Sequence, residues 1–258
     1  MTISFSSIAR AAMILASFAP VGLASAQDTT DCHCVIINRR GEPNAFERRS
    51  SGTISFIQSR PQDAFSKNIG LGYGVNGTYL FRLDKAGYFG LRADAGFLQY
   101  GDESKRVPLS STIGGRVQVD VSTNNYIVPL SIGPQIMWPT GSIRPYANAG
   151  IGGQFFYTQS SVEGSDDINT FARTTNQWDK AASWVAGGGV YVPLYQKRFN
   201  ILLDIGAQYI NGGRARYLKP GSIEDLPNNE IRITPMESST HMVLMKFGVR
   251  LGDVKSFR

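Results

Sequence analysis

The sequence predicts an all-β fold, namely an eight-stranded antiparallel up-and-down transmembrane β-barrel with short periplasmic turns and longer extracellular loops. Three observations support this prediction. Apolar and polar residues alternate with a period of two over long segments, as in strands with two unlike faces. The connections between these segments are alternately short and long. The polar face is rich in glycine rather than in lysine and glutamate.

Residues 1–26 have the pattern of a secretory signal peptide. Arg10 supplies the positive charge, residues 11–19 are a short apolar run, and Ala24-Ser25-Ala26 has the small-x-small form of a cleavage site. No later stretch approaches the ~18 uninterrupted apolar residues that a transmembrane helix needs. We therefore expect an exported chain in which residues 27–50 form a periplasmic N-terminal segment.

The charged residues are few and dispersed. The chain has 26 basic and 20 acidic residues, a formal net charge of +6, and only 18% of its residues are charged. Binding to nucleic acid would need a clustered basic stripe, and the sequence has none. We expect a mildly basic envelope protein that contacts lipid headgroups and has no nucleic-acid partner.

The two cysteines lie in the tripeptide Cys32-His33-Cys34. Residues i and i+2 are too close for a relaxed disulfide, whose Cα atoms are ~5.5 Å apart. A strained local bridge and pairing with another molecule stay open. Consecutive residues rarely converge on one metal ion, and no further ligand cluster follows. We predict no metal site and no cofactor.

Four predicted strands occupy the first half of the barrel. The segment 51–59 alternates only weakly, with Ile54 and Phe56 on one face. The segment 68–83 alternates strongly, and a short turn at 84–87 connects it to the strand 88–100. The fourth strand, 125–138, ends at the turn Pro139-Thr-Gly-Ser142.

Four further strands complete the pattern. The strand 143–157 closes the hairpin that begins at residue 125, and its length matches the ~9–11 tilted residues that cross a bilayer as β-structure. The strands 183–194 and 200–210 are joined by the short turn 195–198, and 241–251 is the last strand. The barrel is therefore expected over residues 51–252, followed by a C-terminal tail at 253–258.

The order of short and long connections predicts the topology. Bacterial barrels have short periplasmic turns and longer extracellular loops, so the long polar connections 101–124, 158–182 and 211–240 are expected outside. Within the first of them, residues 112–122 could extend a strand beyond the membrane. Seven strands alternate clearly, yet a barrel whose ends are both periplasmic needs an even number. This parity predicts that 51–59 is the first strand.

The residues of the polar face predict which side is inside. Glycines such as Gly74, Gly133 and Gly189 suit the narrow interior of an eight-stranded barrel and would leave backbone exposed on a soluble exterior. The opposite face has almost no charge, as lipid requires. The predicted polar and charged lumen network is Arg82, Arg92, Asp94, Arg144, Asp204, Lys246 and Arg250. A soluble lipocalin-like ligand carrier, with the apolar face inside, is the alternative.

Two further expectations concern particular side chains. Aromatic residues near the strand ends suit the membrane interfaces, and the predicted set is Tyr126, Trp138, Tyr157, Trp184 and Tyr209. Asp204 and Lys246 are expected at similar heights on neighbouring strands, pointing inward, so we predict an ion pair between them.

Three segments resemble a known family. Arg144-Pro-Tyr-Ala-Asn-Ala-Gly-Ile-Gly-Gly153, the strand end Met137-Trp138 and the strand start Trp184-Val-Ala-Gly-Gly-Gly look like the OmpA-like, opacity-type eight-stranded outer-membrane proteins. Members often end on an aromatic residue at the last strand, whereas Phe257 is penultimate here. The resemblance implies the outer membrane of a diderm, Gram-negative-type bacterium and a non-enzymatic role in envelope integrity, adhesion or narrow-pore conduction.

The functional hypotheses follow from the barrel. The first is an integral outer-membrane protein with a structural, surface-interaction or narrow-pore role, a lumen filled by side chains and loops that bind any surface partner. Outer-membrane lipid is the expected partner along the wall. The alternative is an enzyme that modifies lipid A, for which Ser239 and His241 are the only same-side pair of nucleophile and base. We predict that the protein is not an enzyme.

Overall fold

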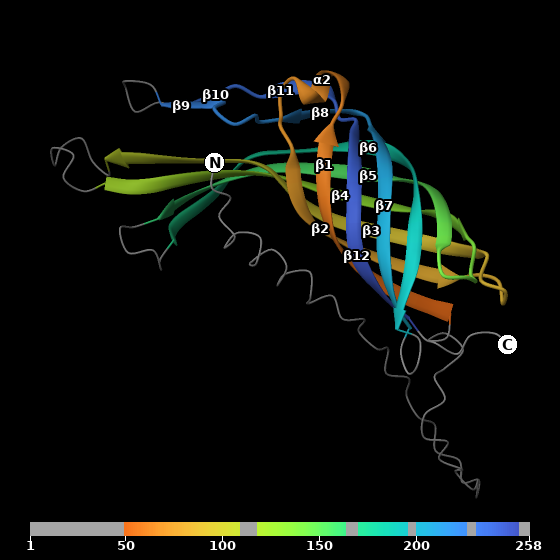
Figure 1. Ribbon diagram of the computed structural model, residues 1–258. Coiled ribbons are helices and arrows are strands. Elements are labelled where there is room, and N and C mark those ends of the chain that lie inside the picture. Colours follow the sequence, from red (N-terminus) through yellow and green to blue (C-terminus); the bar gives the residue numbers. More distant parts are fainter. Residues whose placement is uncertain (1–48, 109–117, 164–169, 196–199, 226–230, 253–258) are drawn as a thin grey trace, which may run out of the picture.

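Eight antiparallel strands close into a single barrel in the computed structural model (Figure 1). The structure describes residues 49–108, 118–163, 170–195, 200–225 and 231–252. The barrel order is β1-β12-β7-β6-β5-β4-β3-β2, so sequential strands are neighbours and the last strand pairs with the first. The predicted fold class is confirmed.

The strand bounds show a wall of uneven length. The barrel strands are β1 (Ser50–Pro61), β2 (Gly72–Arg82), β3 (Phe89–Pro108), β4 (Gln118–Met137), β5 (Arg144–Glu163), β6 (Thr170–Tyr195), β7 (Asn200–Gly212) and β12 (Met242–Gly252). Between β1 and β2 lies the short helix α2 (Asp63–Ser66). The β7–β12 connection contains β8 (Arg214–Tyr217), β9 (Ile223–Asp225), β10 (Ile231–Ile233) and β11 (Met236–Ser239).

The weakly alternating segment at the start of the chain closes the barrel. Strand β1 pairs with β2 from Ser50 to Ser59 and with β12 from Ser51 to Pro61. Both edges of β1 are therefore hydrogen-bonded, as lipid requires of every spanning strand. The prediction from strand parity is confirmed, and β1 is longer than the predicted 51–59.

The two ends of the barrel differ. We call the end that carries Ser50, Gly252 and the short turns the turn end, and the opposite one the loop end. In the β2–β3 turn, the Asp84 carboxylate accepts hydrogen bonds from the backbone amides of Tyr88 (3.0 Å) and Phe89 (2.9 Å). Desolvation acts to raise the pKa of Asp84. The hydrogen bonds from these amides outweigh that effect, so the pKa of Asp84 lies below its usual range.

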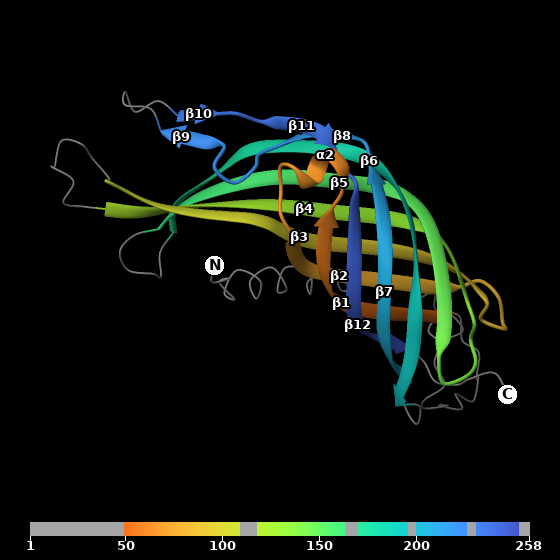
Figure 2. The ribbon, with the colours of Figure 1, turned by 45° about the horizontal axis from the view of Figure 1, so that its top comes forward.

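Two segments predicted as loops are largely strand. Strands β3 and β4 stay paired out to Pro108 and Gln118, and β5 and β6 stay paired out to Glu163 and Thr170. The last pair between β2 and β3 is Tyr73–Gln99, so residues 101–108 continue past the shorter wall by about 25–30 Å. Figures 1 and 2 show these strands projecting beyond the barrel. The expectation that 112–122 could extend a strand is confirmed from Gln118 onwards. Elsewhere polar composition hid the extensions, because strands without a lipid-facing side need no apolar alternation.

The third predicted loop, 211–240, also contains regular structure. Strand β8 pairs with β11 and β9 pairs with β10, forming two small two-stranded sheets. The β8–β11 sheet and α2 lie together over the loop end (Figure 2). The predicted strand 68–83 begins at Gly72, not at residue 68. The alternation of that segment puts Ile69 on its apolar, lipid-facing side, but Ile69 is buried within the loop-end core.

Close approach of neighbouring strands explains the interior glycines. A Cβ atom on Gly74 would overlap the carbonyl oxygen of Phe97, and one on Gly152 would overlap that of Leu130. On the outer wall, a Cβ atom on Gly52 would meet nothing within 4 Å. The inward positions therefore need glycine for steric reasons.

Some predictions concern residues outside the described ranges. The signal peptide, nearly all of the segment 27–50, the turn residues 196–198 and the tail 253–258 lie there, as does the Cys32-His33-Cys34 tripeptide. Among the described residues, no helix has both the length and the apolar character needed to cross a membrane.

The topology is tested by labelling single cysteines in a Cys32→Ser, Cys34→Ser background. Thr140 in the β4–β5 turn and Lys219 at the loop end are both exposed. Cells producing Lys219→Cys should react with an impermeant maleimide when intact, whereas Thr140→Cys should react only after lysis. If only Thr140→Cys were labelled on intact cells, the predicted orientation of the barrel in the membrane would be wrong.

The steric role of the inward glycines is tested by one pair of substitutions. Gly74→Ala should destabilise the barrel by about 1–3 kcal/mol, because the added methyl group overlaps backbone. Gly52→Ala is the matched control on the outer wall and should be close to neutral. Urea unfolding in detergent micelles measures both, and equal stabilities would contradict the interpretation.

Candidate functional site

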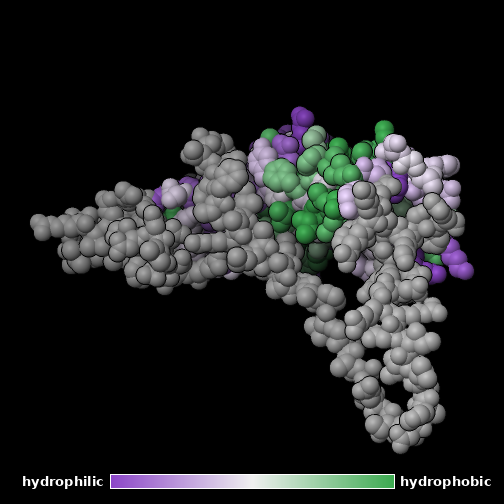
Figure 3. Space-filling model, turned by 60° about the horizontal axis from the view of Figure 1, so that its bottom comes forward, coloured by the Kyte–Doolittle hydropathy of each residue, from purple (hydrophilic) through white to green (hydrophobic). Residues whose placement is uncertain are grey.

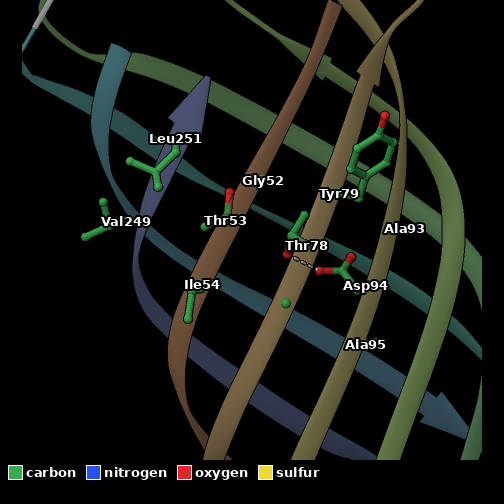
Figure 4. A pocket seen from close by; sticks show the side chains of 11 residues that line it. Gly52, Thr53, Ile54, Thr78, Tyr79, Ala93, Asp94, Ala95, Val249 and Leu251 are labelled. Atoms are coloured by element: carbon green, nitrogen blue, oxygen red, sulfur yellow. Dashed lines mark hydrogen bonds between the residues drawn. The ribbon is translucent and has the colours of Figure 1, made fainter. Parts of the chain in front are cut away.

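A buried carboxylate in the lumen organises the charged side chains that face it. Oδ2 of Asp94, on β3, accepts a hydrogen bond from Nε of Arg92 at 2.7 Å. Oδ1 of the same carboxylate accepts one from Nζ of Lys246 at 3.0 Å. The Thr78 hydroxyl donates to Oδ1 at 2.6 Å (Figure 4), and Asn76 Nδ2 donates to the same oxygen at 3.2 Å. Two cations and two neutral donors thus compensate the desolvation of one carboxylate.

Two tyrosines extend this cluster across the lumen. Arg92 donates to Gln135 Oε1 at 3.0 Å, and Gln135 Nε2 donates to the Tyr191 hydroxyl at 3.4 Å. The rings of Tyr191 and Tyr146 stack with centroids 4.4 Å apart, and the Arg92 guanidinium lies 5.4 Å from the Tyr146 ring. The Tyr146 hydroxyl donates to Asp204 Oδ1 at 2.8 Å.

The connected side chains come from every strand of the barrel. Arg250 on β12 completes the layer, because its Nε donates to the Ser51 hydroxyl at 3.0 Å and its guanidinium lies 4.5 Å from the Tyr191 ring. We call this set the lumen network: Ser51 (β1), Asn76 and Thr78 (β2), Arg92 and Asp94 (β3), Gln135 (β4), Tyr146 (β5), Tyr191 (β6), Asp204 (β7), and Lys246 and Arg250 (β12). It ties all eight strands together inside the barrel.

The ion pair predicted between Asp204 and Lys246 is not the one that forms. Lys246 lies opposite Gly206 in the β7–β12 register, while Asp204 lies opposite Gly248. The Lys246 ammonium reaches Asp94 instead. Asp204 bonds to Tyr146 through Oδ1, and its Oδ2 has no hydrogen-bond partner among the described residues. Height along neighbouring strands was an insufficient guide, because long side chains cross the lumen.

The predicted charged residues therefore separate into two groups. Arg92, Asp94 and Lys246 meet in one cluster, with Asp204 beside it. Arg82, Arg144 and Arg250 line a cavity at the turn end, and Arg250 belongs to both groups. Sequence reasoning missed the network's neutral members Gln135, Tyr146 and Tyr191 as bonding groups, although their inward positions in the alternation were the available signal.

An apolar layer lies between this network and the loop end. Its inward side chains are Ile57, Leu98, Ile127, Phe156, Ile210 and Leu244. Phe65 of α2 and Tyr217 of β8 pack over them, with the Phe65 ring edge-on to Tyr217 at 5.0 Å and to Phe156 at 6.0 Å. The Tyr217 hydroxyl is 2.8 Å from Asn68 Nδ2 and 2.7 Å from the Ser238 hydroxyl. We call Phe65, Tyr217 and their supporting segments the cap.

The outer wall is apolar between aromatic residues at its two ends. Large exposed side chains on this wall include Ile54, Phe56, Leu130, Ile132, Ile151, Phe247 and Val249. Figure 3 shows hydrophobic side chains gathered on the barrel between more hydrophilic regions. Such an exterior suits lipid and does not fit a soluble carrier.

The predicted interface aromatics lie in three contacts on this wall. Tyr126 and Tyr157 pack at 5.1 Å towards the loop end, and Trp184 packs on Tyr209 at 5.8 Å. Trp138 packs edge-on against Tyr88 at 5.5 Å at the turn end. Aromatic residues at both ends of an apolar wall suit the two interfaces of a bilayer.

A shallow groove of about 520 Å³ crosses the lipid-facing wall over β12, β1, β2 and β3 (Figure 4). Gly52 lies there between Leu251 and Tyr79, and Gly77 lies between Ile54 and Ala95. The small residues leave this part of the wall hollow. In a bilayer, lipid chains meet this surface.

The geometry around His241 does not assemble a nucleophilic site. Its ring lies 6.5 Å from that of Tyr209, and its buried Nδ1 has no hydrogen-bond partner in the described part of the chain. Among the described residues, no hydrogen bond joins the predicted partner Ser239 to this imidazole, and the Ser238 hydroxyl is bonded to Tyr217 and to the Ser239 carbonyl. A Ser–His relay needs the hydroxyl bonded to the imidazole. Within the same described ranges, no group of three His, Cys, Asp or Glu side chains is placed to bind a metal.

A closed eight-stranded barrel with an apolar outer wall and aromatic residues at both ends defines an integral outer-membrane β-barrel protein. No protein-family model matches the chain, and no curated protein matches it.

Solved structures of similar architecture include Neisserial surface protein A, at 12% identity with a TM-score of 0.43, covering 79% of this chain and 96% of that one. Ail, the attachment invasion locus protein of Yersinia pestis, is 14% identical, with a TM-score of 0.37 and coverages of 79% and 99%. A major outer-membrane protein of Thermus thermophilus is 12% identical, with a TM-score of 0.40 and coverages of 78% and 98%. The assignment of the class rests on the closed barrel and its exterior.

The pairing in the lumen network is tested by a double-mutant cycle. Asp94→Ala should destabilise the barrel by about 3–5 kcal/mol, because it leaves Arg92 and Lys246 buried without their carboxylate. Adding Lys246→Met should recover part of that loss. The comparison cycle, Asp204→Ala with Lys246→Met, should be close to additive. Urea unfolding followed by tryptophan fluorescence measures both cycles, and strong coupling only in the second would contradict the observed pairing.

Proposed function

We propose that this chain is a non-catalytic outer-membrane protein that acts through its extracellular surface. The observation that carries the proposal is the uneven wall, in which β3–β6 continue past the shorter strands into the space outside the membrane. A membrane-spanning role alone needs strands only as long as the bilayer is thick. The extra length therefore serves a surface that faces water.

The composition of this sheet extension supports a role in recognition. Its described side chains are mostly hydroxyls, amides and charged groups, including Ser104, Asn124, Ser160 and Thr175. Cross-strand bonds hold them in place: Thr123 and Ser160 are 2.8 Å apart, and Gln99 donates to Asn124 at 2.9 Å. Ordered polar groups on a stiff sheet provide hydrogen bonds to a polar partner such as a glycan or a protein surface.

The cap ties the extension to the barrel. Glu103 on β3 accepts the Gly221 backbone amide at 2.7 Å, and the Tyr100 hydroxyl donates to the Leu218 carbonyl at 2.9 Å. On the other side, the Asp179 carboxylate of β6 accepts the Arg216 amide at 2.6 Å. These contacts favour a single, preorganised extracellular surface, which lowers the entropic cost of binding.

The filled lumen supports a surface role over transport. The apolar layer under the cap and the charged layer below it both cross the barrel. An open path for solute would require Phe65 and Tyr217 to move away from the apolar layer. We therefore infer that the protein does not conduct solutes through a wide pore, and that an enzymatic role has no support in the geometry around His241.

A trimmed variant tests the surface role. Residues 102–124 and 159–176 are replaced by two-residue turns, which removes the polar groups named above and preserves the pairs Gly101–Asn125 and Thr158–Gln177 as the last rungs. The barrel should still insert and show heat-modifiable migration, because its wall and lumen are unchanged. Cells with the full chain should attach to surfaces coated with extracellular-matrix glycans and proteins, and cells with the trimmed chain should not.

The same two proteins separate a surface role from a pore or an enzyme. In planar bilayers, both should show no steady conductance, and lipid A from cells that produce either should be unmodified. Equal attachment of both cell types, with conductance or lipid A modification by the full chain, would contradict the proposal.

A further inference from the structure

A small cavity at the turn end of the barrel is lined by three arginines from three different strands. Arg82 is the last residue of β2, Arg144 is the first of β5, and Arg250 is near the end of β12. The cavity measures about 40 Å³, and Ser51 and Tyr191 also line it. The closure of the barrel brings these residues together, although more than 160 positions separate Arg82 from Arg250 in the sequence.

Two of these arginines have contacts that leave their charges uncompensated within the described chain. Arg250 is buried, and its bonds go to the Ser51 hydroxyl at 3.0 Å and the Met137 sulfur at 3.5 Å, with the Tyr191 ring at 4.5 Å. Arg144 donates from Nε to the Gly141 carbonyl at 3.3 Å. These partners are neutral, so they satisfy hydrogen bonds without supplying a counter-charge.

The described carboxylates of the lumen and of the β2–β3 turn are bonded to other groups. Asp94 pairs with Arg92 and Lys246, and Asp204 accepts the Tyr146 hydroxyl. Asp84, in the β2–β3 turn, accepts two backbone amides. No carboxylate lies among the described residues that line the cavity. Gathering guanidinium groups in a partly enclosed space costs electrostatic energy that an anion would offset.

We propose that this cavity binds a small tetrahedral oxyanion of the phosphate type. Its volume matches about three water molecules, at roughly 10–15 Å³ each, which is the size of one such anion. Guanidinium groups are the preferred protein ligands for phosphate oxygens because they donate parallel N–H bonds. The Ser51 hydroxyl, which donates to the Leu80 carbonyl oxygen at 3.5 Å, also faces the cavity. The site lies at the opposite end from the sheet extension and does not depend on the proposed surface role.

The same chemistry has two sources at this end of the barrel. Under the predicted topology the cavity opens towards the periplasm, where free phosphate has access. It also lies near the inner rim of the wall, where anionic lipids present phosphodiester headgroups. Both supply the oxygens that the arginines would bind.

The experiment is a titration of the full chain in uncharged detergent with inorganic phosphate, followed by ³¹P NMR line broadening at constant ionic strength. Saturable binding is expected for the wild-type chain and for Arg216→Gln, an exposed arginine at the loop end that pairs with Glu237. Arg144→Gln should bind phosphate about tenfold more weakly or worse, because it removes one charge-assisted ligand. Arg250→Lys keeps the buried charge and the fold while losing the forked geometry, and should also weaken binding.

The outcomes separate clearly. Absence of saturable binding by the wild-type chain, or equal binding by Arg144→Gln, Arg250→Lys and Arg216→Gln, would overturn the proposal. Asp253→Asn tests the chain's own next carboxylate, and unchanged phosphate binding by this variant is expected. A large gain in affinity would show that Asp253 occupies the cavity and would also overturn it.

A second arm identifies the source of the anion once binding is found. The wild-type chain and Arg144→Gln are reconstituted in phosphatidylcholine vesicles with or without phosphatidylglycerol, and the lipid retained after extraction is identified by native mass spectrometry. Retention of phosphatidylglycerol by the wild-type chain alone would support a lipid headgroup. Phosphate binding without lipid retention would support the free anion.

Discussion

The hydrogen bonding of strand edges in lipid is the constraint on which the rest of this structure depends. Hydrocarbon offers no partner to a backbone amide, so the sheet must close. Closure fixes the even number of strands and places β1 between β12 and β2, although its own sequence alternates only weakly. It also brings the two ends of the described barrel to one side. The short strands β12, β1 and β2 are sufficient for this purpose, and the greater length of β3–β6 needs another explanation.

Closure of only eight strands leaves a narrow interior, and the side chains there follow from its width. Where neighbouring strands approach closely, as at Gly74 and Gly152, even a methyl group would overlap backbone. Elsewhere the lumen is filled by two layers of different character. Towards the loop end, apolar side chains pack under Phe65 and Tyr217. Towards the turn end, Asp94 gathers Arg92 and Lys246, so that burial of these charges is compensated within one connected network.

The two ends of the barrel thus present different chemistry. At the loop end, a stiff polar sheet and a cap form a broad surface suited to hydrogen bonding with a polar partner. At the turn end, arginines from distant parts of the chain share a cavity of the size of one oxyanion. Between them, the filled lumen separates the two sides. This arrangement fits a protein whose interactions occur at its ends and whose wall serves to anchor it in lipid.

The sequence by itself determined the architecture: the number of strands, the inward and outward faces, the short turns and the aromatic ends of the wall. Alternation with a period of two is a local property, so it can be read wherever one face of a strand meets lipid. It suggested an extension only at 112–122 and missed the rest of the extensions of β3–β6, because neither of their faces meets lipid. It also misplaced Ile69, which packs in the cap. Only the tertiary structure decided that Lys246 reaches Asp94 and not Asp204, and that Arg144 and Arg250 share a cavity. Contacts across a lumen depend on strand register and on the reach of long side chains, and neither is encoded in the pattern of any one strand.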